Sequence, residues 1–382
     1  MNFELTDGQE RFREEVRDFL GREVLPKIGE AEEHDQFSIE IFRKGGDYGL
    51  LGVLCPREYG GRGLDNICGA IMGEEMGRVS IGICITILVH AMGVLPIFVQ
   101  LANQEQIRKF VIPAIRGQKL MAIGMTEPNA GSDFGGIETT ARHENGQFVI
   151  NGSKIFITNG NHADLLLAAV VTREKTKVHN KKGISLIVVE KGTPGFSSSR
   201  QIEKLGWRGS DTAELYFDDC RVPQQNILGE ENQGYFYIME ILDISRITFA
   251  AVSVGIVQGT FEESLRIARE KKKLMVSFNN YQGIRFVLAD MATRVEAARK
   301  LVYWAARLKD QGMKVSIQSS MAKLFASEVA NWGVRNALQI YGQRGMLKEY
   351  SIERYFRDAR AMTIAEGTSE IQREIIAKQL GL

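Results

Sequence analysis

The 382-residue chain has few cysteines and prolines and almost no excess charge of either sign. Its 48 basic and 47 acidic residues leave a net charge of +1, which excludes a global field that would attract nucleic acid or an anionic membrane. The four cysteines are far apart and form no CxxC pair, so they indicate reduced thiols rather than a disulfide framework. The five histidines show no metal-ligand spacing, and we expect no metal site. Any ligand must therefore be recognised locally.

The chain also lacks the sequence features of export, of membrane insertion and of two common nucleotide sites. Its first residues are acidic and polar, where a signal peptide is basic and then apolar. The longest apolar run, from Ile81 to about Leu95, is interrupted by Gly82, His90 and Gly93, and we expect it to be too short for a membrane span. No G-x-G-x-x-G follows a strand, and no P-loop is present. These absences predict a cytoplasmic protein.

The pattern of apolar residues divides the chain into three parts. Residues 1–120 are mostly helical in pattern: Phe12, Val16, Phe19 and Leu20 share one helix face after a cap at Thr6 or Asp7. Short strand patterns and turn residues dominate 121–229, and long helical patterns fill 230–382. The sequence predicts an α+β fold with an N-terminal helical domain, a small middle β-barrel or sheet domain and a C-terminal four-helix bundle.

Three Asn-Gly dipeptides, at 145–146, 151–152 and 159–160, flank short alternating runs in the middle part. Asn-Gly is the strongest short hairpin signal, because both residues tolerate a positive φ. We therefore expect hairpins around 147–150 and 154–158. The basic segment 173–182 has no interleaved aromatic residues, so we interpret it as a solvated loop rather than a nucleic-acid surface.

Glu366 lies in a turn-like segment, Glu-Gly-Thr-Ser-Glu, just before a helical tail. A carboxylate beside the free N–H groups of a helix start is suited to removing a proton next to a carbonyl group. On this segment alone the common alternative is favoured: Thr368 or Ser369 caps the last helix, and Glu366 is solvated. Further motifs are needed to decide between the two interpretations.

The order of elements and several motifs together resemble the acyl-CoA dehydrogenase family over nearly the whole chain. Residues 125–133 (MTEPNAGSD) resemble the T-E-P-x-A-G-S-D segment of the family, and residues 156–160 (FITNG) resemble its W-I-T-N-G segment. Taken alone, the first would be a plain loop and the second a hairpin strand. The matches continue at 208–212, 222–229, 339–345, 357–359 and around Glu366.

This resemblance implies FAD as the cofactor, an acyl-CoA as the substrate and Glu366 as the catalytic base. The implied cofactor-binding residues are Met125, Thr126, Ser132, Phe156, Thr158, Lys271, Gln339, Thr368 and Glu370. The implied substrate-binding residues are Ser132, Asp243, Arg246 and Gly367. Without the family, Asp243 and Arg246 would be interpreted as an i,i+3 ion pair on a helix surface.

The chain departs from the family pattern at 271–275, Phe156 and Ala365, and at 342–345 (GQRG), which lacks one glycine of the usual G-G-x-G. Some members carry the base at the position before the arginine, and here that residue is Ser245, which cannot serve. Residues 271–275 (KKKLM) stand where an Arg-x-x-Phe-Gly motif clasps the FAD of a neighbouring subunit, and a lysine lacks the guanidinium fork. Phe156 replaces the commoner Trp. Ala365 replaces a frequent Tyr, which predicts room for branched, cyclic or aryl acyl groups beside the base.

The resemblance implies dehydrogenation of an acyl-CoA to the 2,3-enoyl-CoA. Glu366 would take the α-proton, and the β-hydrogen would pass as hydride to the flavin. Electrons would then go to an electron-transferring flavoprotein, and the protein would be a homotetramer. The motifs do not distinguish direction, so an enoyl-CoA reductase is one alternative. A flavin-binding relative without turnover is another.

Overall fold

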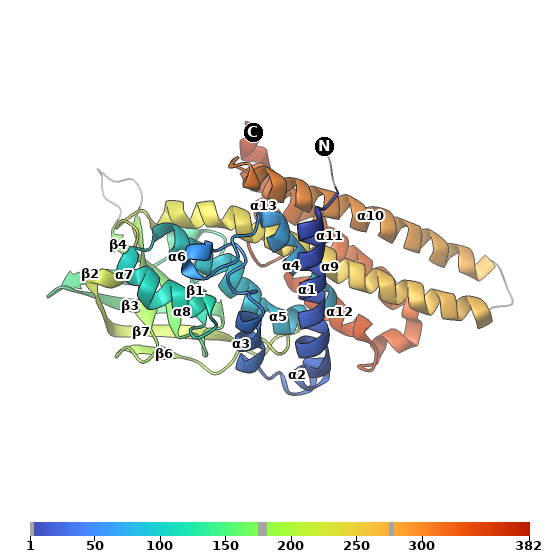
Figure 1. Cartoon of the computed structure of the whole chain (residues 1–382), viewed down its shortest axis with the longest axis horizontal. Coiled ribbons are helices and arrows are strands. Elements are labelled where there is room, and N and C mark those ends of the chain that lie inside the picture. Colours follow the sequence, from blue (N-terminus) through green and yellow to red (C-terminus); the bar gives the residue numbers. More distant parts are fainter. Residues whose placement is uncertain (1–3, 175–181, 275–278) are drawn as a thin grey trace.

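The computed structural model describes residues 4–174, 182–274 and 279–382, without the side chains of 271–274 and 279–281. Figure 1 shows three parts: helices of the N-terminal part in the middle, a sheet at one end and long helices at the other. The long helix α9 runs from the sheet end across the molecule to the far helical end. It therefore connects both parts that surround the site described below.

The N-terminal part is built from short helices, several of them joined without a break. Thr6 caps α1, as expected, in a capping box with Gln9, and Phe12, Val16 and Phe19 are buried on its inner face. The helical elements are α1 (Asp7–Phe19), η1 (Leu20–Val24), η2 (Leu25–Lys27), α2 (Ile28–His34), α3 (Ile39–Asp47), η3 (Arg57–Tyr59), α4 (Asn66–Val79), α5 (Ile81–Leu88), η4 (Val89–Val94), α6 (Leu95–Leu101), α7 (Gln104–Gln106), η5 (Ile107–Val111) and α8 (Ile112–Ile115).

The apolar run that begins at Ile81 is longer than its sequence suggested. Elements α5, η4 and α6 form one helical stretch, Ile81–Leu101, of 21 residues, which is long enough to span a membrane. The prediction that it falls short was therefore wrong, because Gly82 and Gly93 do not break the helix. However, 83% of its most apolar window is buried inside the protein. Burial in the core accounts for its apolar composition.

The middle part forms one sheet with the strand order β6-β7-β3-β2-β4-β5-β8, and β1 pairs with β4 in parallel. Apolar side chains on both faces of the central strands are buried, so the sheet packs between two layers of core. The strands and short helical turns are β1 (Met121–Gly124), η6 (Phe134–Gly136), β2 (Thr140–Glu144), β3 (Gln147–Thr158), β4 (Leu165–Arg173), β5 (Gly183–Glu190), β6 (Phe196–Ser198), β7 (Thr212–Pro223), η7 (Gln224–Asn226) and β8 (Ile227–Leu228).

Only one of the three Asn-Gly dipeptides forms a hairpin turn. Asn145 and Gly146 have φ of 50° and 76° and join β2 to β3. The second dipeptide lies inside β3 at an irregularity in its pairing with β7, and the third ends β3. The expected second hairpin at 154–158 was wrong, because β3 continues through Gly152 as one strand of 12 residues.

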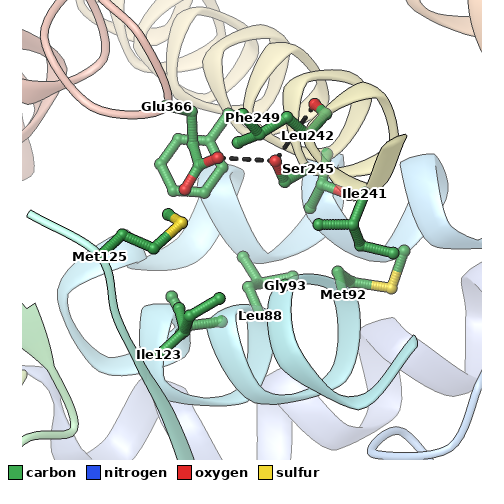
Figure 2. Close-up of a pocket in the computed structure, with 12 residues that line it drawn as sticks. Leu88, Met92, Gly93, Ile123, Met125, Ile241, Leu242, Ser245, Phe249 and Glu366 are labelled. Carbon is green, nitrogen blue, oxygen red and sulfur yellow. Dashed lines mark hydrogen bonds between the residues drawn. The ribbon is translucent and has the colours of Figure 1, made fainter. Parts of the chain in front are cut away.

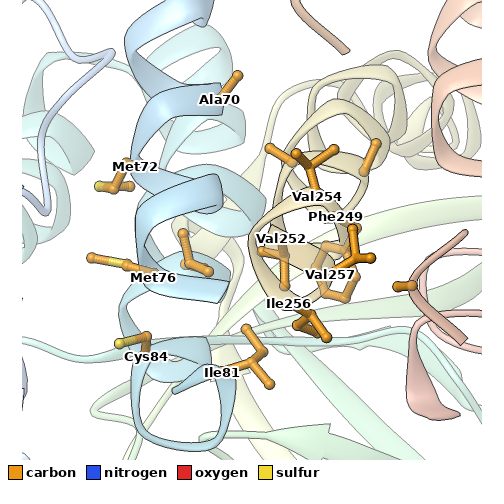
Figure 3. Close-up of a cluster of buried hydrophobic side chains, with 14 of the residues drawn as sticks. Ala70, Met72, Met76, Ile81, Cys84, Phe249, Val252, Val254, Ile256 and Val257 are labelled. Atoms are coloured by element: carbon orange, nitrogen blue, oxygen red, sulfur yellow. The ribbon is translucent and has the colours of Figure 1, made fainter. Parts of the chain in front are cut away.

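The described C-terminal part consists of three long helices, one short 3₁₀ helix and two shorter α-helices: α9 (Gly234–Leu274), α10 (Asn279–Asp310), α11 (Ser316–Tyr341), η8 (Gly342–Met346), α12 (Ser351–Ala361) and α13 (Ser369–Gln379). Helix α4 crosses α9 at close range in the main core, where Gly73 and Gly77 face the backbone of α9; Met72 and Met76 project from the opposite side of α4 (Figure 3). A Cβ added to Gly255 would lie 1.9 Å from the Glu74 carbonyl oxygen, so the crossing requires glycine there. The predicted α+β fold class is confirmed.

Candidate functional site

A small apolar cavity lies where α5, η4, β1 and α9 meet, beside Glu366. Figure 2 shows Glu366 and Ser245 at one side and Met125, Ile123 and Leu88 opposite them. The lining residues are Leu88, Val89, Met92, Gly93, Ile123, Met125, Ile241, Leu242, Ser245, Thr248, Phe249 and Glu366. The Glu366 carboxylate is the only ionisable group in this lining, so the described residues place one base candidate against an apolar chamber.

The carboxylate of Glu366 is held by Ser245. The Ser245 hydroxyl donates to Oε2 of Glu366 at 2.6 Å, and the Leu242 carbonyl oxygen lies 3.2 Å from the same hydroxyl (Figure 2). A hydroxyl has one proton, and the shorter, charge-assisted bond to the carboxylate is the stronger one. Ser245 is not a base, as expected, but it fixes one oxygen of the carboxylate. No sequence pattern predicted this contact, because 121 residues separate Ser245 from Glu366.

Glu366 and Gly367 form a turn with two consecutive left-handed residues. Their φ values are 55° and 87°, and a positive φ is costly for glutamate. Hydrogen bonds from two side chains hold this turn. Lys323 Nζ donates to the Gly367 carbonyl oxygen at 2.6 Å, and Gln372 Nε2 donates to the carbonyl oxygens of Glu366 and Gly367 at 3.1 and 3.0 Å. The Glu366 N–H donates to no described residue.

Asp243 and Arg246 form an ion pair on α9, with Nη1 and Oδ1 3.3 Å apart. The surface-pair interpretation is wrong, because the side chains are only 8% and 7% exposed. Ser316 and Ser319 also donate to the Asp243 carboxylate. The Arg246 Nε is buried without a hydrogen-bond partner among the described residues, and burial lowers the pKa of the guanidinium. A buried donor without a partner is costly, so it suggests a group that this structure does not contain.

On the sheet side, a buried ion pair fixes the segment that carries Met125 and Thr126. Lys154 Nζ on β3 lies 2.6 Å from Oε1 of Glu127, with side-chain exposures of 0% and 5%. The same ammonium lies 3.3 Å from the Met125 carbonyl oxygen, and the Thr126 carbonyl oxygen accepts from the Ile155 N–H. Burial lowers the pKa of Lys154 to about 8 although the Glu127 charge raises it. The sequence prediction missed this pair, because 27 residues separate Glu127 from Lys154 in the chain.

Phe156 and Thr158, both on β3, lie just beyond this ion pair. Phe156 is 63% exposed and has a φ of 60°, so β3 holds a large apolar ring outward in a conformation unfavourable for phenylalanine. The pairing of β3 with β7 shifts between Lys154 and Ile157, which allows this local geometry. An exposed, rigidly presented ring provides a flat apolar surface for a planar ligand.

A second, polar cavity of about 190 Å³ is lined in part by residues that precede and follow the Glu366–Gly367 turn in the chain. Its lining comprises Glu328, Asn331, Arg360, Thr363, Ile364, Thr368, Ser369 and Glu370. Thr368 caps α13 by accepting from the Ile371 N–H, so the predicted helix cap forms. The buried Ser369 hydroxyl has no hydrogen-bond partner among the described residues. The structure thus brings Thr368, Glu370, Gly367 and Glu366 into one short region.

Ser132 and Gln339, two of the predicted site residues, line neither cavity. Ser132 is exposed in a bend before η6. Gln339 is exposed on α11, 16 residues beyond Lys323, which corresponds to roughly 24 Å along a helix. The side chains of Lys271 and Leu274, and Met275 as a whole, lie outside the described residues. Within one chain, Gln339 therefore cannot contact a ligand group held at the Glu366 turn.

Ala365 does not line the apolar cavity. It packs, partly buried, against the main helical core. The cavity itself has a volume of about 30 Å³, so larger acyl groups require its side chains to move. Met92 and Met125 are flexible lining residues that can do so. The predicted room for bulky groups beside Ala365 is not present in this structure.

Comparison with known proteins finds matches to one family along nearly the whole chain. Models of the N-terminal, middle and C-terminal domains of acyl-CoA dehydrogenase match residues 6–118, 122–220 and 232–381. The chain belongs to the acyl-CoA dehydrogenase family. An acyl-CoA dehydrogenase of Bacillus subtilis is 41% identical over 98% of both chains. An acryloyl-CoA reductase (NADH) of Anaerotignum propionicum is 39% identical, covering all of this chain and 96% of that one.

Solved structures have the same fold as this family member over its whole length. Butyryl-CoA dehydrogenase from Megasphaera elsdenii superposes with a TM-score of 0.94 at 35% identity over all of both chains. A chain from a structure described as the electron transferring flavoprotein of Acidaminococcus fermentans also gives a TM-score of 0.94, at 37% identity, covering all of this chain and 99% of that one. This acyl-CoA dehydrogenase family member is thus an oxidoreductase with FAD as its cofactor.

The residues present fit FAD in two respects. Phe156 presents an exposed apolar ring in a strained backbone conformation, as stacking against a flavin ring requires. The polar cavity beside Thr368 contains the unpartnered Ser369 hydroxyl and the Arg360 side chain, which suit the polar part of a nucleotide cofactor.

Proposed function

We propose that the protein oxidises an acyl-CoA thioester to the 2,3-enoyl-CoA, with Glu366 as the base that takes the α-proton. One observation carries this proposal: among the described residues, the Glu366 carboxylate is the only ionisable group that lines the apolar cavity. An α-hydrogen beside a thioester is weakly acidic, so the base must be aligned and the developing enolate oxygen must be stabilised. The FAD, when bound, supplies the two-electron oxidant that accepts the β-hydrogen with its electron pair.

The residues of the chain have separate tasks in this reaction. Ser245 fixes the Glu366 carboxylate, so that its second oxygen faces the substrate. The N–H of Glu366 is available to donate to the thioester oxygen, because it donates to no described residue. Gly367 permits the turn that exposes this N–H. The apolar lining excludes water around the reacting carbons, which strengthens these polar contacts.

Asp243, Arg246 and Ser132 are proposed to contact the substrate. Buried Asp243 holds the guanidinium of Arg246 on α9, and the unpartnered Nε leaves a donor for a ligand. Ser132, exposed before η6, would contact the CoA moiety or a phosphate of the cofactor. Proposed contacts to FAD come from Met125, Thr126, Phe156, Thr158, Thr368 and Glu370.

Gln339 and Lys271 would contact the FAD of a neighbouring subunit. This assignment is supported by the distance of Gln339 from the other proposed FAD residues within one chain. It requires an oligomer, and we propose a cytoplasmic homotetramer. Electrons would leave to an electron-transferring flavoprotein, a proposal supported by the likeness to a chain from a structure of such a flavoprotein.

A reductase is the second candidate function, favoured by the 39% identity to an acryloyl-CoA reductase. Its Glu366 would donate the proton instead of accepting it. The non-catalytic alternative is disfavoured by the base held against the cavity.

Anaerobic addition of a panel of acyl-CoAs to the purified protein, monitored by flavin bleaching, separates the three functions. A dehydrogenase bleaches with saturated acyl-CoAs of the right length. A reductase, first reduced chemically, is reoxidised by enoyl-CoAs much faster than the oxidised enzyme is bleached. Neither reaction in a protein that retains FAD would contradict both enzyme proposals.

A further inference from the structure

Lys323 on α11 is a buried cation that the reaction described above does not use. It is only 1% exposed, and its ammonium group donates to a neutral acceptor, the Gly367 carbonyl oxygen, at 2.6 Å. No carboxylate of the described residues lies within 4.0 Å of it. Burying an ammonium without a paired carboxylate is costly, so a residue with only a packing role would more economically be apolar.

The other charges around Lys323 already have partners. Arg246 on α9 is paired with Asp243. Glu328 on α11 and Glu370 on α13 both face Arg373, at 3.5 and 3.9 Å. The Glu366 carboxylate remains, and among the described residues it bonds only the neutral hydroxyl of Ser245.

We propose that Lys323 is a positioning residue for the base: it anchors the Glu366–Gly367 turn through the Gly367 carbonyl oxygen and provides the counter-charge for the Glu366 carboxylate. This inference rests on the proposed function, in which Glu366 is the base. Its first consequence is geometric, because the turn contains two left-handed residues whose conformation needs external support. Its second consequence is electrostatic, because the ammonium charge of Lys323 acts on the Glu366 carboxylate, whereas the neighbouring charges named above already have partners.

The two consequences can be separated, because Gln372 shares only the first. Gln372 Nε2 bonds the same two carbonyl oxygens but carries no charge. Lys323 can also lose its charge. Burial, the largest cause, lowers the pKa of Lys323 to about 8, and the charge of Arg246 lowers it too. The charges of Glu366, Glu328 and Glu370 raise this pKa, Glu366 most strongly. The counter-charge should therefore disappear as pH rises through about 8.

The test compares Lys323→Met and Gln372→Leu in the FAD-loaded enzyme, by the anaerobic rate of flavin reduction below and above pH 8. Both variants should slow reduction, by roughly tenfold or more for the charged donor. In the wild type and in Gln372→Leu, the rate of flavin reduction should fall as pH rises through about 8, whereas in Lys323→Met it should not. Ser327→Ala, one turn further along α11 with a buried hydroxyl bonded to its own helix, is the matched control and should behave as wild type.

If Lys323→Met does not fold, Lys323→Gln replaces it in the test, because glutamine keeps a hydrogen-bond donor without the charge. Its rate of flavin reduction should also not fall above pH 8. A lysine with a purely structural role would lower the unfolding temperature but leave the pH profile unchanged, and that result would overturn the proposal. Glu366→Gln is measured beside them. If it is slow while both Lys323 variants match wild type, the role of Lys323 is wrong and the base stands. If Glu366→Gln itself reduces normally, the proposed function is wrong.

Discussion

The site is bordered by two regions that each contain a buried lysine with a pKa lowered by burial to about 8. On the sheet side, Lys154 is neutralised by a carboxylate 2.6 Å away, which in turn accepts the backbone N–H groups of Glu138 and Thr139. On the helical side, Lys323 bonds a neutral carbonyl oxygen and has no carboxylate within ion-pair distance among the described residues. The first lysine is satisfied locally and holds a backbone segment, whereas the second leaves its charge available to the base.

The largest expected effect comes from breaking the satisfied pair. Lys154→Met would leave the Glu127 carboxylate buried beside its backbone donors without a counter-ion, which costs about 3–5 kcal/mol of stability. The segment carrying Met125 should loosen, so we expect a lower unfolding temperature and weaker FAD retention, measured by release of flavin fluorescence on dilution. Adding Glu127→Gln should recover part of both losses, because no unpaired charge remains.

The control for that experiment is a second, somewhat less buried ion pair away from the flavin segments, with side-chain exposures of 19% and 7%. Arg299 lies 2.9 Å from Glu74, in the contact of α10 with α4. Arg299→Met should lower the unfolding temperature with FAD retention unchanged. Equal loss of FAD in both variants would mean that global destabilisation, and not the Lys154 pair, controls cofactor retention.

A substitution in the apolar lining of the cavity should change substrate preference without involving Lys154 or Lys323. A Cβ added at Gly93 meets no atom within 4 Å, so Gly93→Val should fold and narrow the cavity. Valine adds three carbon atoms to the lining, and the space of even one methylene is worth roughly 1–3 kcal/mol of discrimination. We expect kcat/KM for a long-chain acyl-CoA to fall much more than for butyryl-CoA. Gly21→Val, in another open π-helical turn outside the cavity, is the control, and an equal response to both substrates would argue against this wall.

Arg246→Lys tests whether the helical side depends on geometry as well as charge. The variant keeps the cation but loses the planar fork and the unpartnered Nε. We expect kcat/KM to fall at least tenfold, or about 1.4 kcal/mol. A solvated pair would change stability by only roughly 0.2–0.5 kcal/mol, and a kinetic effect of that size would place Arg246 outside the reaction.

The smallest expected effect is on the pH dependence of stability, and it should be shared by both lysines. A lysine whose pKa falls from 10.5 to about 8 on folding binds fewer protons in the folded than in the unfolded chain between these values. Stability should therefore rise with pH in this window. The unfolding temperature of wild type relative to Lys323→Met should increase from pH 8 to 10.5. A constant difference would indicate that Lys323 is not desolvated.

The sequence predicted the parts of the site that are local in the chain. The Glu366 turn, the cap at Thr368 and the exposed ring of Phe156 all lie in short motifs, and the family resemblance indicated the fold. The supporting contacts were missed, because they join residues distant in the chain: Lys154 to Glu127, Lys323 to Gly367 and Ser245 to Glu366. Such pairs depend on how α9, α11 and β3 pack, which periodicity does not specify. The role expected for Ala365 failed for the same reason, since packing turned it toward the core.

The removal of the α-proton by Glu366 can be tested with a single conservative substitution. Glu366→Gln keeps the shape of the side chain and can still accept from Ser245, so FAD content and acyl-CoA binding should remain near wild type. Anaerobic reduction of its flavin by the best acyl-CoA of the panel should be slower by roughly 10²- to 10⁴-fold. Reduction at a rate close to wild type, in a variant that binds FAD and substrate normally, would contradict the assignment of Glu366 as the base.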